Sequence, residues 1–171
     1  MLLITKRCES SMPASERLVL PFELRQKSRL RTRAESGEEA ALFLERGAVL
    51  RGGDRLEAED GRVVEVVAAP EKLLLVRAQS NRELARAAYH LGNRHIPVEV
   101  GTDMLKLEYD HVLLEMLLGL GVAATEELGP FEPEAGAYGG GHRHGGDDAA
   151  EAGAARDAGM VELLTIRRPP Q

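Results

Sequence analysis

Hydrophobic and polar positions alternate in short runs over the first seventy residues. The segments LLITKR, RLVLPF and SRLRTRA are each bounded by Pro, Ser or Gly. In SRLRTRA the leucine and threonine side chains point opposite to Arg29, Arg31 and Arg33, as on a half-exposed strand with a basic outer face. Later apolar runs are separated by the turn sequences GGD and DG. The pattern predicts a small β sandwich or roll over residues 1–70.

The periodicity changes after Pro70, where LLLVRA is a strand of the buried type. The next segment, SNRELARAAYHLGN, carries a capping box formed by Ser80 and Glu83, and Gly92 is placed to end the helix. Its apolar residues fall on one helical face: Leu84, Ala87, Ala88 and Leu91.

Two further strands, IPVEV and MLKLEY, precede a second helix, HVLLEMLLGL, which Asp110 can cap and which stops near Gly119 and Gly121. VAATEEL is the last strand, so the order βαββαβ predicts a ferredoxin-like domain. The fold class is therefore α+β, with three parts. A small all-β domain spans residues 1–70, the ferredoxin-like domain spans 71–130, and a flexible tail rich in Gly, His and acidic residues spans 131–171.

The distribution of charged residues along the chain indicates which classes of partner it can bind. The net charge of −6 divides into +1 over residues 1–77, −4 over 78–129 and −3 over 130–171. An acidic second half repels phosphate and attracts cations, so we expect no nucleic-acid partner. No apolar run is long enough to span a bilayer, and Cys8 is the single cysteine. We therefore expect a cytoplasmic protein without a membrane partner.

All five histidines lie at or after residue 90, which is the first indication of metal chemistry. His95 follows a helix stop in a loop, where functional groups are commonly presented, although a lone loop histidine is more often structural. His142 and His144, in GGGHRHGGDD, can reach one ion from an extended backbone, or they belong to a low-complexity tail without a role. His111 stands in the first turn of the second helix, and His90 lies on the first helix.

Catalytic motifs are absent. The chain has no P-loop, G-x-G-x-x-G, G-x-S-x-G or H-E-x-x-H, so we expect no catalytic residue and no enzyme activity. One chain also lacks three ligands in ordered structure, which a catalytic zinc site needs. Two copies of His95 across a two-fold axis, with mobile tails, would build an open and exchangeable site.

Three motifs in order carry a resemblance: G-N-R-H-x-P, Y-D-H-V-L and F-E-P-E-A-G-A-Y. With them the chain resembles the UreE family, the nickel-carrying urease accessory proteins of bacteria. The resemblance runs from the first strand to about residue 144. It implies an N-terminal β domain that contacts partners and a C-terminal ferredoxin-like domain that binds metal and dimerises.

The resemblance also implies the ligands and the partners. His95 would be the nickel ligand shared between subunits, His142 and His144 would supplement it, and His111 would match a secondary site whose other position is Tyr109 here. Ni(II) would be the cargo, with Zn(II) or Cu(II) as alternatives in vitro. The partners would be a second copy, with larger forms in the presence of metal, the urease accessory GTPase and apo-urease.

Two other functions fit the pattern less well. A nucleic-acid-binding βαββαβ module stacks bases on aromatics of its central strands, but LLLVRA has none and MLKLEY only Tyr109. A metal-dependent hydrolase needs a general base beside the ion. Asp110 or Glu108 could serve, but no motif places either one, and Asp110 is better explained as a helix cap.

Overall fold

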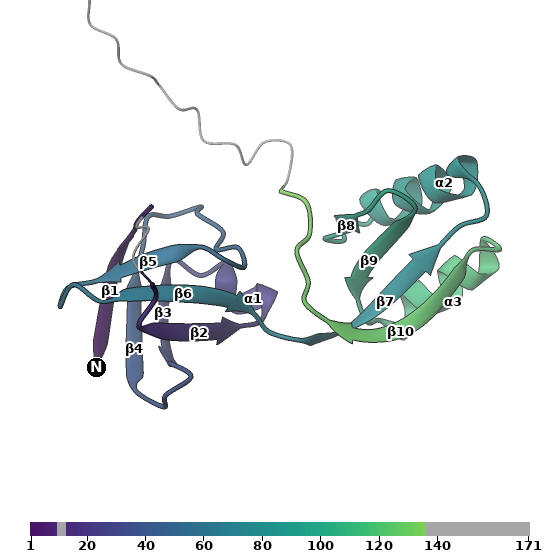
Figure 1. Cartoon of the computed structure of the whole chain (residues 1–171). Coiled ribbons are helices and arrows are strands. Elements are labelled where there is room, and N and C mark those ends of the chain that lie inside the picture. Colours follow the sequence, from purple (N-terminus) through teal and green to yellow (C-terminus); the bar gives the residue numbers. More distant parts are fainter. Residues whose placement is uncertain (10–12, 136–171) are drawn as a thin grey trace, which may run out of the picture. The chain divides into compact units, whose positions relative to one another are not determined.

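The computed structural model describes residues 1–9 and 13–135 (Figure 1). The predicted ligands His142 and His144 lie outside the described residues. No helix in the described ranges is long and apolar enough to cross a membrane.

The N-terminal domain is built on one six-stranded sheet in the order β2-β6-β5-β1-β4-β3. Strand β1 runs parallel to β4 and β2 runs parallel to β6, while the other neighbours are antiparallel. The elements are β1 (Leu2–Arg7), β2 (Glu16–Leu20), α1 (Phe22–Arg25), β3 (Arg29–Arg33), β4 (Glu39–Phe43), β5 (Arg55–Ala58) and β6 (Val63–Ala68).

One apolar core serves the whole sheet. Leu18 of β2 and Leu42 of β4 belong to the same buried cluster although three strands separate β2 from β4 in the sheet. The sheet must therefore curve around a single core, which agrees with the predicted sandwich or roll. Leu, Val, Ile and Ala fill this core, as the low aromatic content requires.

The short helix α1 was not expected from the sequence. RLVLPF reads as one strand, but β2 ends at Leu20 and Pro21 is the N-cap of α1. Proline has no N–H for a ladder and its fixed φ suits a helix start, so the chain turns there. The carboxylate of Glu71 accepts a hydrogen bond from the Phe22 amide at 2.8 Å and satisfies one of the free donors of the turn.

The C-terminal domain is the predicted ferredoxin-like βαββαβ unit. Its sheet has the order β10-β7-β9-β8 with every neighbouring pair antiparallel. Residues of both helices share one buried cluster with β7 and β9. The elements are β7 (Glu71–Arg77), α2 (Asn81–Gly92), β8 (Glu99–Val100), β9 (Met104–Glu108), α3 (His111–Gly119) and β10 (Ala123–Gly129).

Strand β8 is shorter than the sequence predicts. Of IPVEV only Glu99 and Val100 pair with β9. Pro97 cannot donate to a ladder, and the carbonyl of Val98 accepts a hydrogen bond from the Glu134 amide at 2.8 Å instead. The segment that precedes β8 is therefore a loop that joins α2 to the sheet edge.

Packed structure continues beyond residue 130, where the sequence suggested that the tail begins. Phe131 is fully buried against Phe22 and Leu73, with the two phenyl rings edge to face at 5.5 Å. Glu132 forms an ion pair with the buried Arg25 at 2.8 Å. A large aromatic in a polar segment is enough to hold these residues against the core, because its burial stabilises by about 2–3 kcal/mol.

Candidate metal centre

His95 follows the C-terminal end of helix α2, whose own start is well defined. The Ser80 hydroxyl accepts a hydrogen bond from the Glu83 amide at 3.3 Å, as the predicted capping box requires. The Glu83 carboxylate accepts from the Gln79 amide at 3.0 Å, one residue before the expected position. Ala87 and Leu91, two of the four predicted apolar positions, are fully buried. The helix therefore holds a fixed position on the sheet.

The turn after α2 places His95 in a left-handed conformation. The helix ends at Gly92 as predicted, but the residue with positive φ is His95, at 55°. The His95 amide donates to the Gly92 carbonyl at 2.9 Å and the Ile96 amide to the Leu91 carbonyl at 3.3 Å. Leu91 and Ile96 also pack in one apolar cluster. These contacts define a Schellman motif with His95 at the position where glycine is usual.

Helix α3 ends in the same motif and provides an internal comparison. The Gly121 amide donates to the Leu118 carbonyl at 2.9 Å and the Val122 amide to the Leu117 carbonyl at 3.1 Å. Gly121 has φ 79° at the position that His95 occupies in the first motif. His95 is the one non-glycine residue with positive φ within the described ranges. A side chain costs roughly 1 kcal/mol in this conformation, so stability does not explain the histidine.

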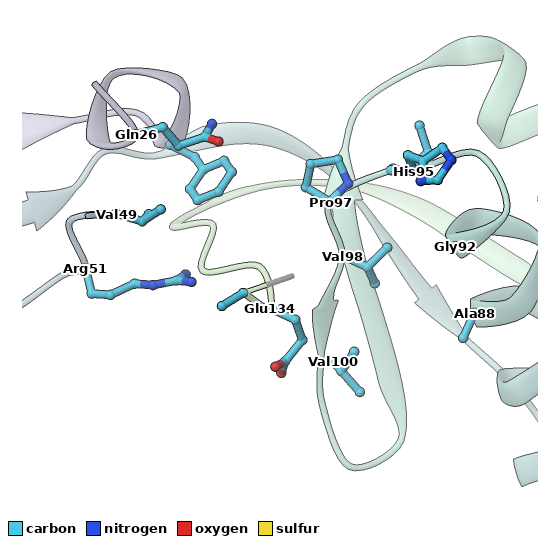
Figure 2. Close-up of a pocket in the computed structure, with 13 residues that line it drawn as sticks. Gln26, Val49, Arg51, Ala88, Gly92, His95, Pro97, Val98, Val100 and Glu134 are labelled. Atoms are coloured by element: carbon cyan, nitrogen blue, oxygen red, sulfur yellow. The ribbon is translucent and has the colours of Figure 1, made fainter. Parts of the chain in front are cut away.

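The His95 side chain is exposed at a pocket of about 510 Å³ (Figure 2). Pro97, Val98 and Val100 follow His95 along one wall, and the lining is mainly apolar. The neighbouring Arg94 guanidinium donates to the His90 carbonyl at 3.0 Å and so folds back along the helix. The imidazole is therefore presented on a rigid turn beside an apolar surface, free to bind a ligand.

His111 and Asp110 occupy the start of α3. The Asp110 carboxylate accepts hydrogen bonds from the Val112 and Leu113 amides at 2.7 and 3.1 Å, which confirms the helix cap. His111 is exposed at the first position of the helix. The ring of Tyr109 lies under the Lys72 ammonium, 3.6 Å from its centroid, and is thereby engaged in a cation–π contact.

The described part of the chain holds no group of three or more His, Cys, Asp or Glu residues arranged to bind a metal. Neither His95 nor His111 therefore belongs to a complete ligand set within residues 1–9 and 13–135. His90 is half-buried, and its ring lies edge to face with that of Tyr89 at 5.3 Å between centroids. One exposed imidazole is a partial metal site, because Ni(II) and Zn(II) need several ligands.

A hydrolytic centre finds little support in the same region. The pKa of Glu108 is raised, first by desolvation and then by the carboxylates of Glu71 and Glu23. A raised pKa suits a general base, but Asp110 is committed to its helix and no ligand group gathers near either residue in the described ranges.

The fold and the site together define a two-domain α+β protein whose ferredoxin-like domain presents the exposed imidazole of His95 on a left-handed turn. Residues 4–69 match the family model described as UreE urease accessory protein, N-terminal domain, and residues 71–156 match the model of its C-terminal domain. The chain belongs to the UreE family of urease accessory proteins.

Individual members of the family are close in sequence. The urease accessory protein UreE of Cupriavidus necator is 66% identical over 131 residues, which are 77% of this chain and 68% of the relative. The UreE of Cupriavidus pinatubonensis is 65% identical over 131 residues, 77% of this chain and 59% of the relative. The UreE of Ralstonia nicotianae is 60% identical over 135 residues, 79% of this chain and 64% of the relative. The matched segment thus leaves about a third or more of each relative uncovered.

Proposed function

We propose that this chain is a nickel metallochaperone and not an enzyme. It binds Ni(II) and delivers it to apo-urease in the cytoplasm, together with the urease accessory GTPase. The observation that carries the proposal is the exposed His95, held in a left-handed turn where glycine would be more stable. Membership of a family of urease accessory proteins supports the destination of the metal.

The site is completed by a second copy of the chain. One imidazole is too few for a stable nickel site, and two copies across a two-fold axis supply two. Val100, which lines the pocket beside His95, is 53% exposed in the single chain, so an apolar surface is available for such a contact. His142 and His144 would supply further ligands from each subunit, and His111 a secondary site.

A shared site of this kind suits transfer. Ligands from separate chains and tails can leave one at a time, so the ion passes to a partner through partly bound states. Imidazole alone does not select nickel, because Cu(II) binds nitrogen ligands more tightly and Zn(II) binds them well. Selection would then come from partners and metal supply, and Zn(II) or Cu(II) should compete with Ni(II) in vitro.

Nickel titration followed by calorimetry tests the role of His95. The substitution His95→Gly keeps the left-handed turn and removes the imidazole, so the affinity for nickel should fall at least about tenfold. His90→Gln is the matched control, since it removes a histidine outside the proposed ligand set and should leave the affinity unchanged. Equal tight binding by wild type and His95→Gly would reject His95 as the central ligand.

Light scattering with and without nickel tests the shared site. A metal held by two chains stabilises their association, so nickel should shift the mass toward the dimer or larger forms at low protein concentration. His95→Gly should abolish the shift. A mass that does not respond to nickel at low protein concentration would show that bridging by the ion is not needed for association.

A further inference from the structure

Strand β3 forms a free edge of the N-terminal sheet, since it stands last in the strand order. The Leu44 amide donates to the Ser28 carbonyl at 2.7 Å, and the Ala34 amide donates to the Glu38 carbonyl at 2.8 Å. In an antiparallel ladder every second residue bonds to the neighbour, so the even-numbered residues of this segment bond to β4. The odd-numbered residues, Arg29, Arg31 and Arg33, therefore direct their backbone N–H and C=O groups away from β4.

The same three residues carry exposed arginine side chains. Arg33 is paired with Glu39 at 3.0 Å. Within the described ranges Arg29 and Arg31 have no hydrogen-bond or ion-pair partner. Phe43, which stands opposite Arg29 in the register, is 50% exposed. The edge therefore combines free backbone groups, two unneutralised guanidinium groups and an exposed aromatic ring.

The free edge has a defined length. Just beyond β3 the Glu35 amide donates to the Arg17 carbonyl of β2 at 2.9 Å, and the side chains of these residues form an ion pair at 2.8 Å. This contact closes the C-terminal end of the edge. The open stretch is Arg29–Arg33, long enough to pair with about five residues of an added strand.

The arginines of β3 have a simpler explanation, because charged residues on edge strands discourage aggregation. Any charged residue would serve that role, and an exposed phenylalanine would not. The planar guanidinium of arginine, by contrast, matches a carboxylate in two parallel hydrogen bonds. Arginine and aromatic residues are enriched among the residues that dominate protein interfaces.

We propose that the β3 edge binds an extended acidic segment of a partner protein by strand addition. The backbone of the segment would pair with Arg29, Arg31 and Arg33. Side chains of an added strand alternate between faces, so carboxylates at every second position would meet Arg29 and Arg31. The partner is thus a peptide with acidic residues in alternation, and its recognition is independent of the nickel role of His95.

Fluorescence anisotropy with a labelled peptide tests the proposal on the full chain. The probe alternates Glu and Thr over nine residues, and its partner probe has the same composition with the Glu residues contiguous. Wild type should bind the alternating probe at least about threefold more tightly than the contiguous one. The double substitution Arg29→Glu/Arg31→Glu should weaken binding about tenfold or more, because two attractive pairs become repulsive.

The matched control is Arg82→Glu/Arg86→Glu, which makes the same charge change at exposed positions of α2 and should leave binding nearly unchanged. Circular dichroism confirms that each variant is folded. A probe methylated on the backbone N–H groups that face β3 should bind at least tenfold more weakly.

Several results would overturn the proposal. The first is no binding of the alternating probe by the wild type. The second is an equal loss of affinity in both double variants, and the third is equal affinity for the methylated and unmethylated probes. The last two would attribute any binding to net charge alone. Aggregation of Arg29→Glu/Arg31→Glu without peptide binding by the wild type would assign the arginines to protection of the edge. Preferential binding of a single-stranded oligonucleotide over the acidic probe would identify a different class of partner.

Discussion

At the scale of single residues, His95 has a left-handed backbone conformation that a glycine would adopt at lower cost in free energy. The two helices of the C-terminal domain end in the same hydrogen-bond pattern, one with Gly121 and one with His95. The turn after α3 therefore has the residue that favours this conformation, and the turn after α2 has a residue whose side chain can bind a ligand. A local choice that costs stability is expected at a functional site.

In the absence of metal, His95→Gly should raise the free energy of unfolding by about 1 kcal/mol, while Gly121→Ala should lower it by about 1 kcal/mol. Urea denaturation measures both. Excess nickel should make the wild type more stable than His95→Gly, because only the folded wild type gains free energy from binding the ion. A His95→Gly variant less stable than the wild type without metal would show that the turn is not strained.

Glu38 is paired with two cationic groups, the Arg62 guanidinium and the amino group of Met1. Hydrogen bonds from Arg62 and from the amino group of Met1 lower the pKa of Glu38 to about 2. A carboxyl with a lowered pKa stabilises the folded state above its ordinary pKa of about 4.5, and this contribution is lost as the pH falls toward 2. Glu38→Gln should therefore flatten the dependence of stability on pH between about 4.5 and 2. An unchanged slope would show that the ion pairs do not persist in solution.

At the scale of elements, the segment after β10 is held to the core by the buried ring of Phe131 and by the ion pairs of Glu132 with Arg25 and Arg51. Arg25 is fully buried, and its guanidinium donates to the carbonyls of Leu20, Leu50 and Phe131 and to the Glu132 carboxylate. Burial acts to raise the pKa of Glu132, but hydrogen bonds from the Gly52 amide and from the guanidinium groups of Arg25 and Arg51 outweigh it and hold this pKa below its usual value. The short helix α1 is thus the element that receives the end of the ferredoxin-like domain.

Removal of these contacts should have unequal effects. Arg25→Ala leaves buried carbonyls without donors and should cost about 3 kcal/mol, as should Phe131→Ala, which opens a cavity. Glu132→Gln should cost about 1 kcal/mol or less, because the Glu132 side chain is 33% exposed and keeps a hydrogen-bonding oxygen. Thermal unfolding measures the three variants. A loss of stability in Glu132→Gln as large as in the other two variants would show that the charge of the Arg25–Glu132 pair provides the stabilisation.

At the scale of the whole molecule, the two domains carry different surfaces. The N-terminal sheet ends in an arginine edge, and the C-terminal domain presents an imidazole beside apolar residues. This division fits the proposed role, in which one surface would contact partner proteins and the other would hold an ion. It also explains the charge distribution, since the basic edge lies in the half of the chain with net charge +1.

Much of the fold follows from local pattern. The βαββαβ order, the caps at Ser80 and Asp110 and the stop of α3 near Gly119 and Gly121 are confirmed, because each depends on residues within a few positions of one another. Helix α1 and the short β8 were missed. In both, a proline removes a ladder donor, and distant residues then decide where the chain goes.

The candidate site was found only in part by pattern. The position of His95 after the helix is visible in the sequence, and the motif around it marks the family resemblance. Its left-handed backbone is not visible, because Gly92 offered a more favourable place for that conformation. The parallel pairing of β1 with β4 and of β2 with β6 was likewise beyond local pattern, since contacts between distant segments determine it.

By itself, the sequence determined the domain order, the acidic character of the second half and the position of the candidate metal ligand His95, because periodicity, charge and residue type are local properties. Only the tertiary structure decided that this histidine replaces glycine in a Schellman turn, that Phe131 and Glu132 are anchored to α1, and that the arginines of β3 stand on a free edge. Each of these depends on which distant groups satisfy one another's hydrogen bonds and cover one another's apolar surface.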